Sequence, residues 1–261
     1  MTGIITDNEG KKNPLLRIRD LALHYSSTRR TAFERVDFEL QVGEIIAIIG
    51  PSGCGKSSLL KTIAAVHQPS RGDIQWRNNK PPEWAYIFQD PTLLPWMTAM
   101  GNVEVPLKLR GIDKTERKRK CEEAIQRVLL QDAKSHYPKA LSGGMRMRVS
   151  LARALSLQPE LMFLDEPFGA LDAITRNQMN ELILRLQREA GWGAILVTHS
   201  VNEAVYLADK ILVMSASPGS ISEQIEIELP RDRKPSLQTE SVFQDYVLDI
   251  RNRLNSLCPN L

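Results

Sequence analysis

A long apolar run is missing from this sequence of 261 residues. Its longest continuous apolar stretches, such as Ile45–Ile49, hold only a handful of residues, whereas a helix that spans a bilayer needs roughly 20. The N-terminal segment also lacks the basic-then-apolar order of a secretory signal. We therefore expect a soluble, non-secreted chain that does not cross a membrane by itself.

Cysteine and histidine are both scarce. The three cysteines, Cys54, Cys121 and Cys258, lie far apart and form no CxxC pair. In a chain without a secretory signal this pattern predicts free thiols instead of disulfides or a zinc site. The four histidines show no metal-ligand spacing such as HExxH, so we expect no structural metal centre.

An excess of one charge is absent too. The 34 Lys and Arg residues stand against 31 Asp and Glu, which gives a net charge of only +3. Nucleic-acid binding usually requires a concentrated basic face. A basic run, Lys114–Lys120, falls in an expected helix, where we interpret it as a solvated face instead of a site for nucleic acid or anionic lipid. Nucleic acid is therefore not an expected partner.

Short apolar runs alternate with helical patterns along most of the chain. Ile45–Ile49, Leu161–Asp165 and Gly193–Thr198 have the composition of buried parallel strands. Helical spacing follows each of them, and this order predicts an α/β fold with a mostly parallel sheet and helices on both faces. Near the N-terminus, Leu16–Tyr25 and Val36–Leu40 indicate two further strands. After the first helix, the sequence up to Pro82 is expected to be turn-rich.

The chain divides into three predicted parts. Residues 1–13 are polar and aperiodic and are expected to form a flexible tail. Residues 14–230 form the folded domain, with a helical segment, about 92–157, inserted to one side of the sheet. Residues 231–261 form an extension that is expected to be helical and to dock on the domain or on a partner. Its apolar positions at helical spacing are Val242, Tyr246, Val247, Ile250 and Leu254.

The segment Gly50–Ser57, here called the phosphate loop, matches the pattern GxxxxGK[ST] between a buried strand and a helix. Its glycines let successive N–H groups approach phosphate oxygens, and the helix N-terminus favours negative charge. Lys56 is suited to the β- and γ-phosphates of a nucleotide, and the Ser57 hydroxyl is suited to Mg²⁺. Cys54, inside the loop, is either a small filler residue or a thiol made reactive by the helix N-terminus.

Polar side chains follow the ends of three other expected strands. Asp165 and Glu166 follow an apolar strand, where the first carboxylate is suited to Mg²⁺ and the second to polarising an attacking water. His199 ends another strand and is suited to a developing charge at the γ-phosphate. Gln89 follows the strand-like run Trp84–Phe88, where its amide is expected to orient water or Mg²⁺.

A second anion site is expected at Leu141–Met145, because this segment precedes a helix. The Ser142 hydroxyl and the exposed N–H groups there are suited to phosphate. One chain then carries two phosphate-binding helix N-termini. The simplest arrangement is two chains head to tail, in which each chain completes the site of the other.

The ordered set GPSGCGKS, Gln89, LSGGM, LMFLDE, Ala170–Asp172 and His199 resembles the ATP-binding subunits of ABC transporters. The resemblance covers about residues 15–225. It implies a P-loop NTPase with a RecA-like core, an antiparallel β portion and an inserted helical subdomain. It also implies ATP hydrolysis with ATP and Mg²⁺ as cofactors, and a second ATPase subunit, identical or a close paralogue, bound head to tail.

The resemblance assigns roles to individual residues. It implies catalytic roles for Glu166, His199, Gln89 and Lys56, and metal ligation by Ser57, Gln89 and Asp165. Tyr25 matches the aromatic residue that stacks on adenine, with a core or surface tyrosine as the alternative. The implied nucleotide-binding residues are Tyr25, Gly50, Pro51, Ser52, Gly53, Cys54, Gly55, Lys56, Ser57, Ser58, Ser142, Gly143, Gly144 and Asp172.

A narrower resemblance links Phe88–Thr98, Asp165–Asp172 and Val213–Gly219 to importers of nitrate, sulfonate, taurine and bicarbonate. It implies transmembrane permease subunits as partners, a periplasmic or lipid-anchored solute-binding protein as an indirect one, and a peripheral position on the cytoplasmic face of the bacterial inner membrane. Phe88–Thr98 would then contact the permease, or else form an internal cluster. Met145 replaces the glutamine that is more general in the superfamily signature, and Met147 stands where this branch usually has a second glutamine. The alternative function is an ABC-type ATPase that acts on nucleic acid or protein assembly without a transporter.

Overall fold

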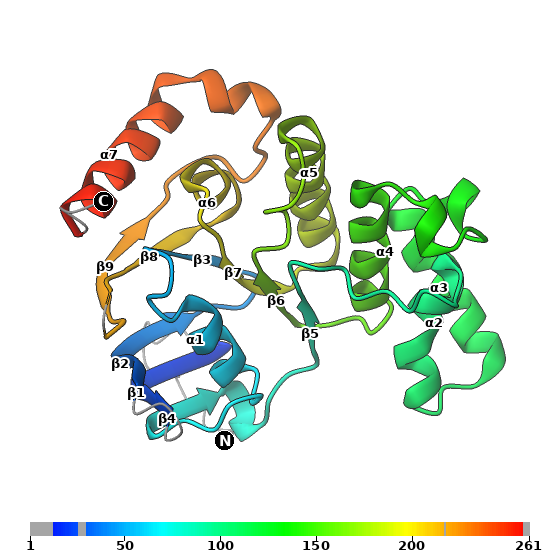
Figure 1. Ribbon diagram of the computed structural model, residues 1–261, viewed down its shortest axis with the longest axis horizontal. Coiled ribbons are helices and arrows are strands. Elements are labelled where there is room, and N and C mark those ends of the chain that lie inside the picture. Colours follow the sequence, from blue (N-terminus) through cyan, green and yellow to red (C-terminus); the bar gives the residue numbers. More distant parts are fainter. Residues whose placement is uncertain (1–12, 26–29, 217, 258–261) are drawn as a thin grey trace, which may run out of the picture.

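The computed structural model describes residues 13–25, 30–216 and 218–257. They form two sheets, one of six strands in the order β5-β6-β7-β3-β8-β9 and one of three strands in the order β2-β1-β4 (Figure 1). The strands are β1 (Leu16–Tyr25), β2 (Arg30–Leu40), β3 (Ile45–Ile49), β4 (Arg71–Trp76), β5 (Trp84–Ile87), β6 (Leu161–Asp165), β7 (Gly193–Val197), β8 (Lys210–Met214) and β9 (Ile221–Glu226). The helices are α1 (Lys56–Ile63), α2 (Ala99–Leu109), α3 (Lys114–Arg127), α4 (Gly143–Leu155), α5 (Ala173–Ala190), α6 (Val201–Leu207) and α7 (Ser241–Leu257).

The six-stranded sheet is parallel except for β9, which pairs with β8 in the antiparallel direction. Its central strands are apolar on both faces because both faces are covered. In β3, Ile45, Ala47 and Ile49 enter one core cluster while Ile46 and Ile48 enter another. The predicted mostly parallel sheet with an antiparallel portion is confirmed.

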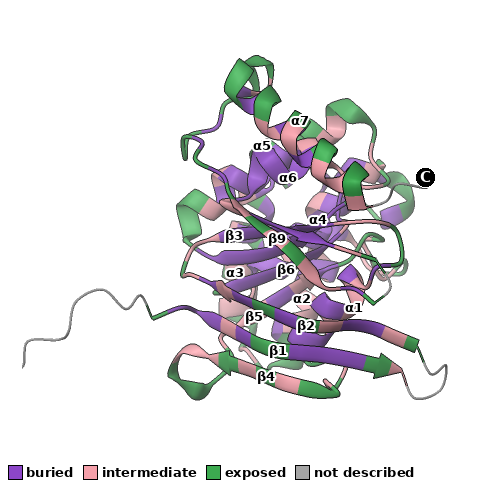
Figure 2. Cartoon of the chain, turned by 90° about the vertical axis from the view of Figure 1, so that its left-hand side faces the viewer, coloured by how far each residue is buried: buried purple, intermediate pink, exposed green. Residues whose placement is uncertain are grey.

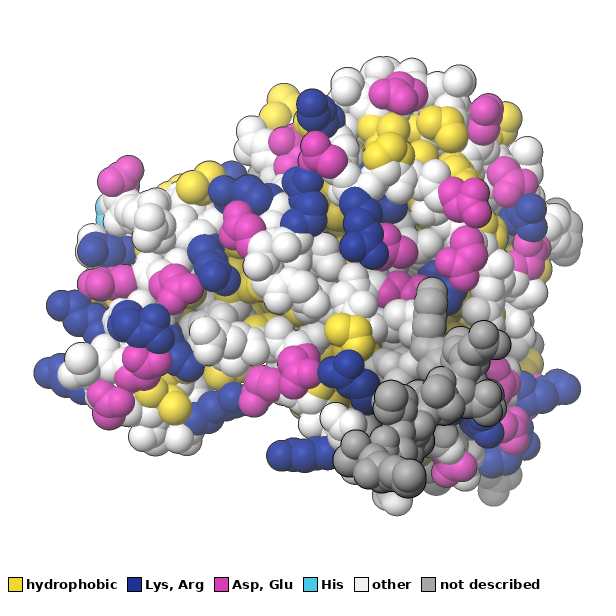
Figure 3. Space-filling model, turned by 180° about the vertical axis from the view of Figure 1, so that it is seen from behind, with side chains coloured by type: hydrophobic (Ala, Val, Ile, Leu, Met, Phe, Trp, Pro, Cys, Tyr) yellow, Lys and Arg dark blue, Asp and Glu magenta, His cyan; other side chains and the backbone are white. Residues whose placement is uncertain are grey.

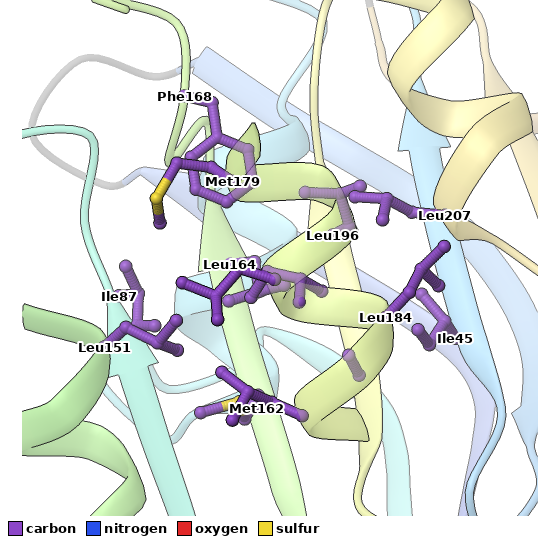
Figure 4. Close-up of a cluster of buried hydrophobic side chains, with 14 of the residues drawn as sticks. Ile45, Ile87, Leu151, Met162, Leu164, Phe168, Met179, Leu184, Leu196 and Leu207 are labelled. Carbon is purple, nitrogen blue, oxygen red and sulfur yellow. The ribbon is translucent and has the colours of Figure 1, made fainter. Parts of the chain in front are cut away.

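Different elements cover the two faces. Helices α5 and α6 cover one face, where Leu184 and Leu207 meet Ile45 (Figure 4). The other face packs on α1 and on the three-stranded sheet, so the buried strands lie between two layers (Figure 2). Phe33 and Phe38 of β2 are fully or almost fully buried there. The second layer is therefore mainly an antiparallel β-sheet, with α1 as its helix. The alternation of strands and helices predicted helices on this face, whereas the family resemblance implied an antiparallel β portion.

The three-stranded sheet corrects the turn prediction for the residues before Pro82. Arg71–Trp76 forms strand β4, which pairs with β1 in the antiparallel direction. Side chains of β4 alternate between exposed and half-buried, and Ile74 and Trp76 pack on the core. The short strand has few apolar residues of its own, so its pairing with β1 decides its structure.

Helices α2, α3 and α4 lie between β5 and β6 in the sequence and stand to one side of the sheet (Figure 1). Buried residues from all three helices, with Ala85 and Ile87 of β5, belong to the core cluster on the α5 side of the sheet. Met147 of α4 is 2 % exposed and lies in that cluster, so its side chain serves packing. The predicted boundaries of the insertion, the tail and the extension stay predictions, and residues 1–12 and 258–261, with Cys258, lie outside the described residues.

The C-terminal helix α7 packs on α6. Phe243, Val247 and Ile250 are its buried residues, and the ring of Phe243 lies 6.5 Å from that of Tyr206. Val242, expected on the apolar side, is 43 % exposed, because Phe243 occupies the position that faces α6. Among the described residues, every helix is too short or too polar to span a membrane.

Candidate nucleotide site

The phosphate loop joins β3 to α1 at the carboxyl end of the parallel strands, where ligands bind in open α/β sheets. A pocket of about 710 Å³ opens there. Its lining comes from the loop, α1, the ends of β1 and β2, and the residue after β6. The lining residues are Tyr25, Arg30, Ala32, Ser52, Gly53, Gly55, Lys56, Ser57, Ser58 and Glu166. The structure thus brings Tyr25 and Glu166, far apart in the sequence, to the phosphate loop.

Glycine is required where the loop turns into α1. Gly55 has φ of 103°, in the left-handed region, and a Cβ there would lie 2.5 Å from the carbonyl oxygen of Ala32. A Cβ at Gly50 would lie 2.4 Å from the carbonyl oxygen of Met214. Any larger residue would push the loop away from β2 and β8. Pro51, between them in the loop, accepts the Cys54 N–H at 3.4 Å.

The Lys56 side chain is held within the phosphate loop. Its Nζ donates to the carbonyl oxygens of Gly50 and Pro51, each at 2.8 Å, and lies 3.8 Å from Cys54 Sγ. Lys56 is 6 % exposed and lines the pocket. The loop therefore keeps a positive charge beside its own N–H groups, which is suited to a polyphosphate.

Two residues from the three-stranded sheet border the loop. Tyr25 ends β1, and its hydroxyl donates to Ser58 Oγ at 3.1 Å. The ring of Tyr25 is half-buried and meets the ring of His67 edge-on at 5.7 Å. Arg30 begins β2 and donates to the carbonyl oxygen of Gly53 at 3.0 Å. Sequence reasoning missed Arg30, because no local pattern indicates that β2 starts beside the loop.

Ser57 and Asp165 meet across the site. The Ser57 hydroxyl donates to Asp165 Oδ1 at 2.7 Å, and the Tyr86 hydroxyl donates to Asp165 Oδ2 at 2.9 Å. Burial and the Asp165 charge raise the pKa of Tyr86, so its phenol stays a donor. A hydroxyl and a carboxylate side by side are hard oxygen ligands, the donor set that Mg²⁺ prefers. The residues present therefore fit a magnesium ion.

Glu166 follows Asp165 in a strained conformation that places it in the pocket. Its φ of 48° lies in the left-handed region, and its N–H donates to the carbonyl oxygen of Val197 at 2.9 Å. Glu166 Oε2 lies 3.4 Å from His199 Nδ1. Strain of this kind is stabilised by the surrounding structure and is frequent at functional sites.

Gln89 lies near His199 but is exposed. A Cβ placed on Gly169 would lie 3.4 Å from both Gln89 Nε2 and His199 Cε1, so the two side chains approach Gly169 together. The Gly169 N–H in turn donates to the carbonyl oxygen of Glu166 at 3.1 Å. Among the described residues, Gln89 forms no hydrogen bond with Ser57 or Asp165, so its metal ligation stays a prediction.

The Leu141–Met145 segment, called the signature below, begins α4 outside this pocket. Ser142 is the N-cap of α4 and accepts the Met145 N–H at 3.2 Å. Gly143 and Gly144 form the first turn, and a Cβ at Gly144 would lie 2.6 Å from Thr175 Cγ2 of α5. None of these residues is among the described residues that line the pocket.

The nearby Asp172 is the N-cap of α5. Its carboxylate accepts the Thr175 N–H at 3.0 Å and the Thr175 hydroxyl at 2.7 Å. These hydrogen bonds hold the pKa of Asp172 below its usual range. The side chain is exposed, and the segment Ala170–Asp172, called the D-loop below, thus forms a fixed turn on the surface.

Cys54 is buried inside the phosphate loop, with 1 % of its surface exposed. Burial raises the pKa of its thiol, and the nearby Lys56 only partly opposes this effect. A thiol with a raised pKa is less ionised at neutral pH. The structure therefore favours the interpretation of Cys54 as a filler residue over that of a reactive thiol.

Two surfaces were singled out by the sequence. In Phe88–Thr98, Trp96 is 69 % and Phe88 41 % exposed, which suits an interface better than an internal cluster.

In α3, Arg119 pairs with Glu116 at 2.7 Å and with Glu123 at 3.3 Å. Positive and negative side chains are interspersed over the face seen in Figure 3, as expected for a solvated surface.

Comparison with known proteins decides the family. Residues 33–169 match the family described as ABC transporter. The chain belongs to this family. The aliphatic sulfonates import ATP-binding protein SsuB 1 of Shouchella clausii (strain KSM-K16) is 44 % identical over 232 residues, 89 % of each chain. The taurine import ATP-binding protein TauB of Pseudomonas aeruginosa is 40 % identical over 215 residues, 81 % of this chain and 82 % of TauB.

A solved structure agrees in fold. A dimeric post-hydrolysis state of the ATP-binding cassette MJ0796, bound to ADP and Pi, has a TM-score of 0.72 and 27 % identity. It covers 82 % of this chain and 100 % of its own. The predicted family and P-loop fold are confirmed: this ABC protein is an importer ATP-binding subunit and an ATPase coupled to transport.

Proposed function

We propose that this ABC ATPase powers the uptake of a small anion, such as a sulfonate, taurine, nitrate or bicarbonate, and that the pocket beside the phosphate loop is its catalytic site. The observation that carries the site assignment is the meeting of Lys56, Ser57, Asp165, Glu166 and His199 at one edge of the sheet. The sulfonate and taurine import proteins among its relatives support the substrate class.

In this proposal, each group acts on a different part of ATP. Tyr25 provides a ring for the base, and the phosphate loop with Lys56 binds the phosphates. Ser57 and Asp165, with Gln89 as a further predicted ligand, would hold Mg²⁺, which would neutralise phosphate charge. Glu166 accepts a proton from the attacking water, and His199 holds Glu166 Oε2 in position at 3.4 Å and faces the γ-phosphate.

The second half of the site comes from another chain. The signature presents Ser142, Gly143 and Gly144 at a helix N-terminus that lies outside the pocket of its own chain. A helix N-terminus is suited to phosphate. We infer that two chains bind head to tail, so that the signature and Asp172 of one chain close over the ATP of the other.

The transport partners follow from this arrangement. The exposed Phe88 and Trp96 lie in the same segment as Gln89, so a permease bound there is positioned to sense the γ-phosphate end of the pocket. Import ATP-binding subunits are peripheral to the inner membrane, and we assign this chain to its cytoplasmic face. A solute-binding protein would supply the anion to the permease from the other side. The similarity to SsuB 1 and TauB gives no support to a role in nucleic-acid or protein assembly.

The test replaces Glu166 by Gln, which keeps the shape of the side chain and removes the base. We expect phosphate release to fall by at least about a hundredfold while ATP still binds and promotes dimer formation. Glu160→Gln is the matched control, because Glu160 lies just before the first residue of β6, whereas Glu166 lies just after the last. Hydrolysis by Glu166→Gln at the wild-type rate would exclude Glu166 as the base. Radiolabelled-anion uptake by a deletion strain would test the substrate class.

A further inference from the structure

A buried carboxylate lies behind the segment that carries His199. Glu203, in the first turn of α6, is 4 % exposed, and a buried carboxylate is costly unless neighbouring groups compensate it. Burial raises the pKa of Glu203, while the Thr198 hydroxyl, Arg176 and His199 oppose that rise. Glu203 does not line the pocket, and the catalytic scheme above does not use it.

The hydrogen bonds of Glu203 reach both neighbours of His199. The Thr198 hydroxyl donates to Glu203 Oε2, and the same hydroxyl accepts the Ser200 N–H at 3.0 Å. The Glu203 N–H donates to Ser200 Oγ at 3.3 Å. In an ordinary capping box the glutamate would bond the N-cap N–H itself. Here the Thr198 hydroxyl is inserted between the two, so the carboxylate fixes the residues on either side of His199.

The other side of Glu203 faces α5. Among the described residues, Glu203 Oε1 and Arg176 Nε are both buried polar atoms without a hydrogen-bond partner. Arg176 uses its Nη2 to donate to the carbonyl oxygen of Leu171 in the D-loop, at 2.9 Å. The charges of Arg176 and Glu203 attract each other. The guanidinium is therefore bonded to the D-loop and acts on the Glu203 carboxylate through its charge, while no hydrogen bond or ion pair joins the two side chains among the described residues.

We propose that Glu203 is a positioning residue for ATP hydrolysis, which joins the His199 segment to the D-loop through the Thr198 hydroxyl and the Arg176 guanidinium. This inference rests on the proposed function, in which the D-loop lies at the head-to-tail interface and His199 supports Glu166. A second chain that contacts the D-loop then sets the position of His199. Glu203 itself touches neither ATP nor the attacking water.

The first test removes the hydroxyl that Glu203 holds. In the purified full-length chain, Thr198→Val should lower kcat for ATP hydrolysis by about tenfold, with KM for ATP unchanged within about twofold, because misplacing a catalytic group by a small distance has a large cost. Thr198→Ser restores the hydroxyl and should restore kcat. Ser156→Ala, which removes another buried hydroxyl at the end of α4, should leave kcat unchanged.

The second test separates the charge of Glu203 from its volume. Glu203→Gln still accepts from Thr198 but no longer attracts Arg176, so kcat should fall by about threefold to tenfold. Combining it with Arg176→Met should add no further loss, because both substitutions remove one shared interaction. Glu44→Gln, which changes a half-buried carboxylate at the other end of the sheet, should leave kcat unchanged.

The melting temperature and ATP affinity of each variant decide between positioning and stability. If Thr198→Val and Glu203→Gln lower the melting temperature but keep the wild-type kcat, the proposal is wrong and Glu203 is only structural. A fully additive loss in the double variant would overturn the link to Arg176. Measuring Glu166→Gln alongside distinguishes failure of the proposed function from failure of this inference. If Glu166→Gln abolishes turnover while the Glu203 and Thr198 variants do not alter kcat, the proposed function stands and this inference is wrong.

Discussion

The two ends of the parallel strands carry ionisable groups that are arranged in opposite ways. At the amino end, Lys210 Nζ lies 3.2 Å from Glu44 Oε1 and 3.3 Å from Glu226 Oε1. Asp209 there accepts the Ile45 N–H at 2.9 Å. At the carboxyl end, Glu166 has a strained backbone, and among the described residues its carboxylate pairs only with the exposed His199, at 3.4 Å.

This difference separates groups that hold the sheet from groups that act on a ligand. The charges at the amino end pair with one another, and the Asp209 carboxylate accepts the N–H at the start of β3, a hydrogen bond that contributes to stability. The groups at the carboxyl end keep donors and acceptors directed into the pocket. Its polar side chains are organised by neighbours such as Tyr86, which holds Asp165 from behind.

The largest effect is expected from removing one aspartate at each end. Asp165→Ala should lower kcat by at least about a hundredfold, because it removes the carboxylate beside Ser57 that fits Mg²⁺. Asp209→Ala should keep kcat and instead lower the free energy of unfolding by about 1–3 kcal/mol, because the buried Ile45 N–H loses its acceptor. ATPase assays and urea unfolding of both variants provide the measurement.

A result in which both variants lose activity equally, after correction for the folded fraction, would remove the distinction between the two ends. If Asp165→Ala instead lowers the free energy of unfolding more than Asp209→Ala does, the distinction between the two ends has to be restated. That result would mean that Tyr86 and Ser57 stabilise the fold through Asp165 as well as positioning it.

Much of this carboxyl end follows from the sequence alone. Parallel strands deliver the polar residues at or after their ends to the same edge of the sheet, so Lys56, Glu166 and His199 were predicted together. The order of the strands across the sheet has no local signal. The contact of Tyr86 with Asp165 depends on β5 lying beside β6, and for this reason Tyr86 was not foreseen.

Two other features depend on tertiary pairing in the same way. Strand β4 contains Gly72 and polar residues and becomes a strand only because β1 offers it a partner. Arg30 meets Gly53 because β2 begins beside the phosphate loop. The spacing of Ser200 and Glu203 did carry a signal, that of a capping box, although the insertion of Thr198 between them is visible only in three dimensions.

An intermediate effect is expected at two aspartates that cap helices. Asp172 caps α5 and Asp113 caps α3, so replacing either by Ala should lower the melting temperature by roughly 2–4 °C at pH 7. Only Asp172 lies in the D-loop, so only Asp172→Ala should also weaken ATP-dependent dimer formation, as measured by sedimentation. Equal dimerisation of both variants would place the D-loop outside the interface.

The pH dependence of the Asp172 cap has a definite sign. The pKa of Asp172 is lower in the folded chain than in the unfolded chain, so its stabilising effect is complete above the unfolded value, about 4. The effect is lost as the pH falls through the folded value. The difference in melting temperature between wild type and Asp172→Ala should therefore persist from pH 7 to about 5 and shrink below about 4. A difference that grows in acid would contradict this origin.

The smallest effect is expected from alkylation of the two buried thiols. One of them, Cys54, lies in the phosphate loop beside the pocket, and the other, Cys121, lies in helix α3. Burial raises the pKa of Cys54, and burial with the nearby Glu104 raises the pKa of Cys121 to about 11. In a Cys258→Ser background, iodoacetamide at pH 8 should therefore modify both more slowly than a free thiol, whose pKa is about 8.5. ATP should slow the modification of Cys54 further and leave that of Cys121 unchanged, because only Cys54 lies in the phosphate loop. Labelling of Cys54 at the same rate with and without ATP would show that the loop does not close around the nucleotide, and the contrast between the two thiols would then reflect burial alone.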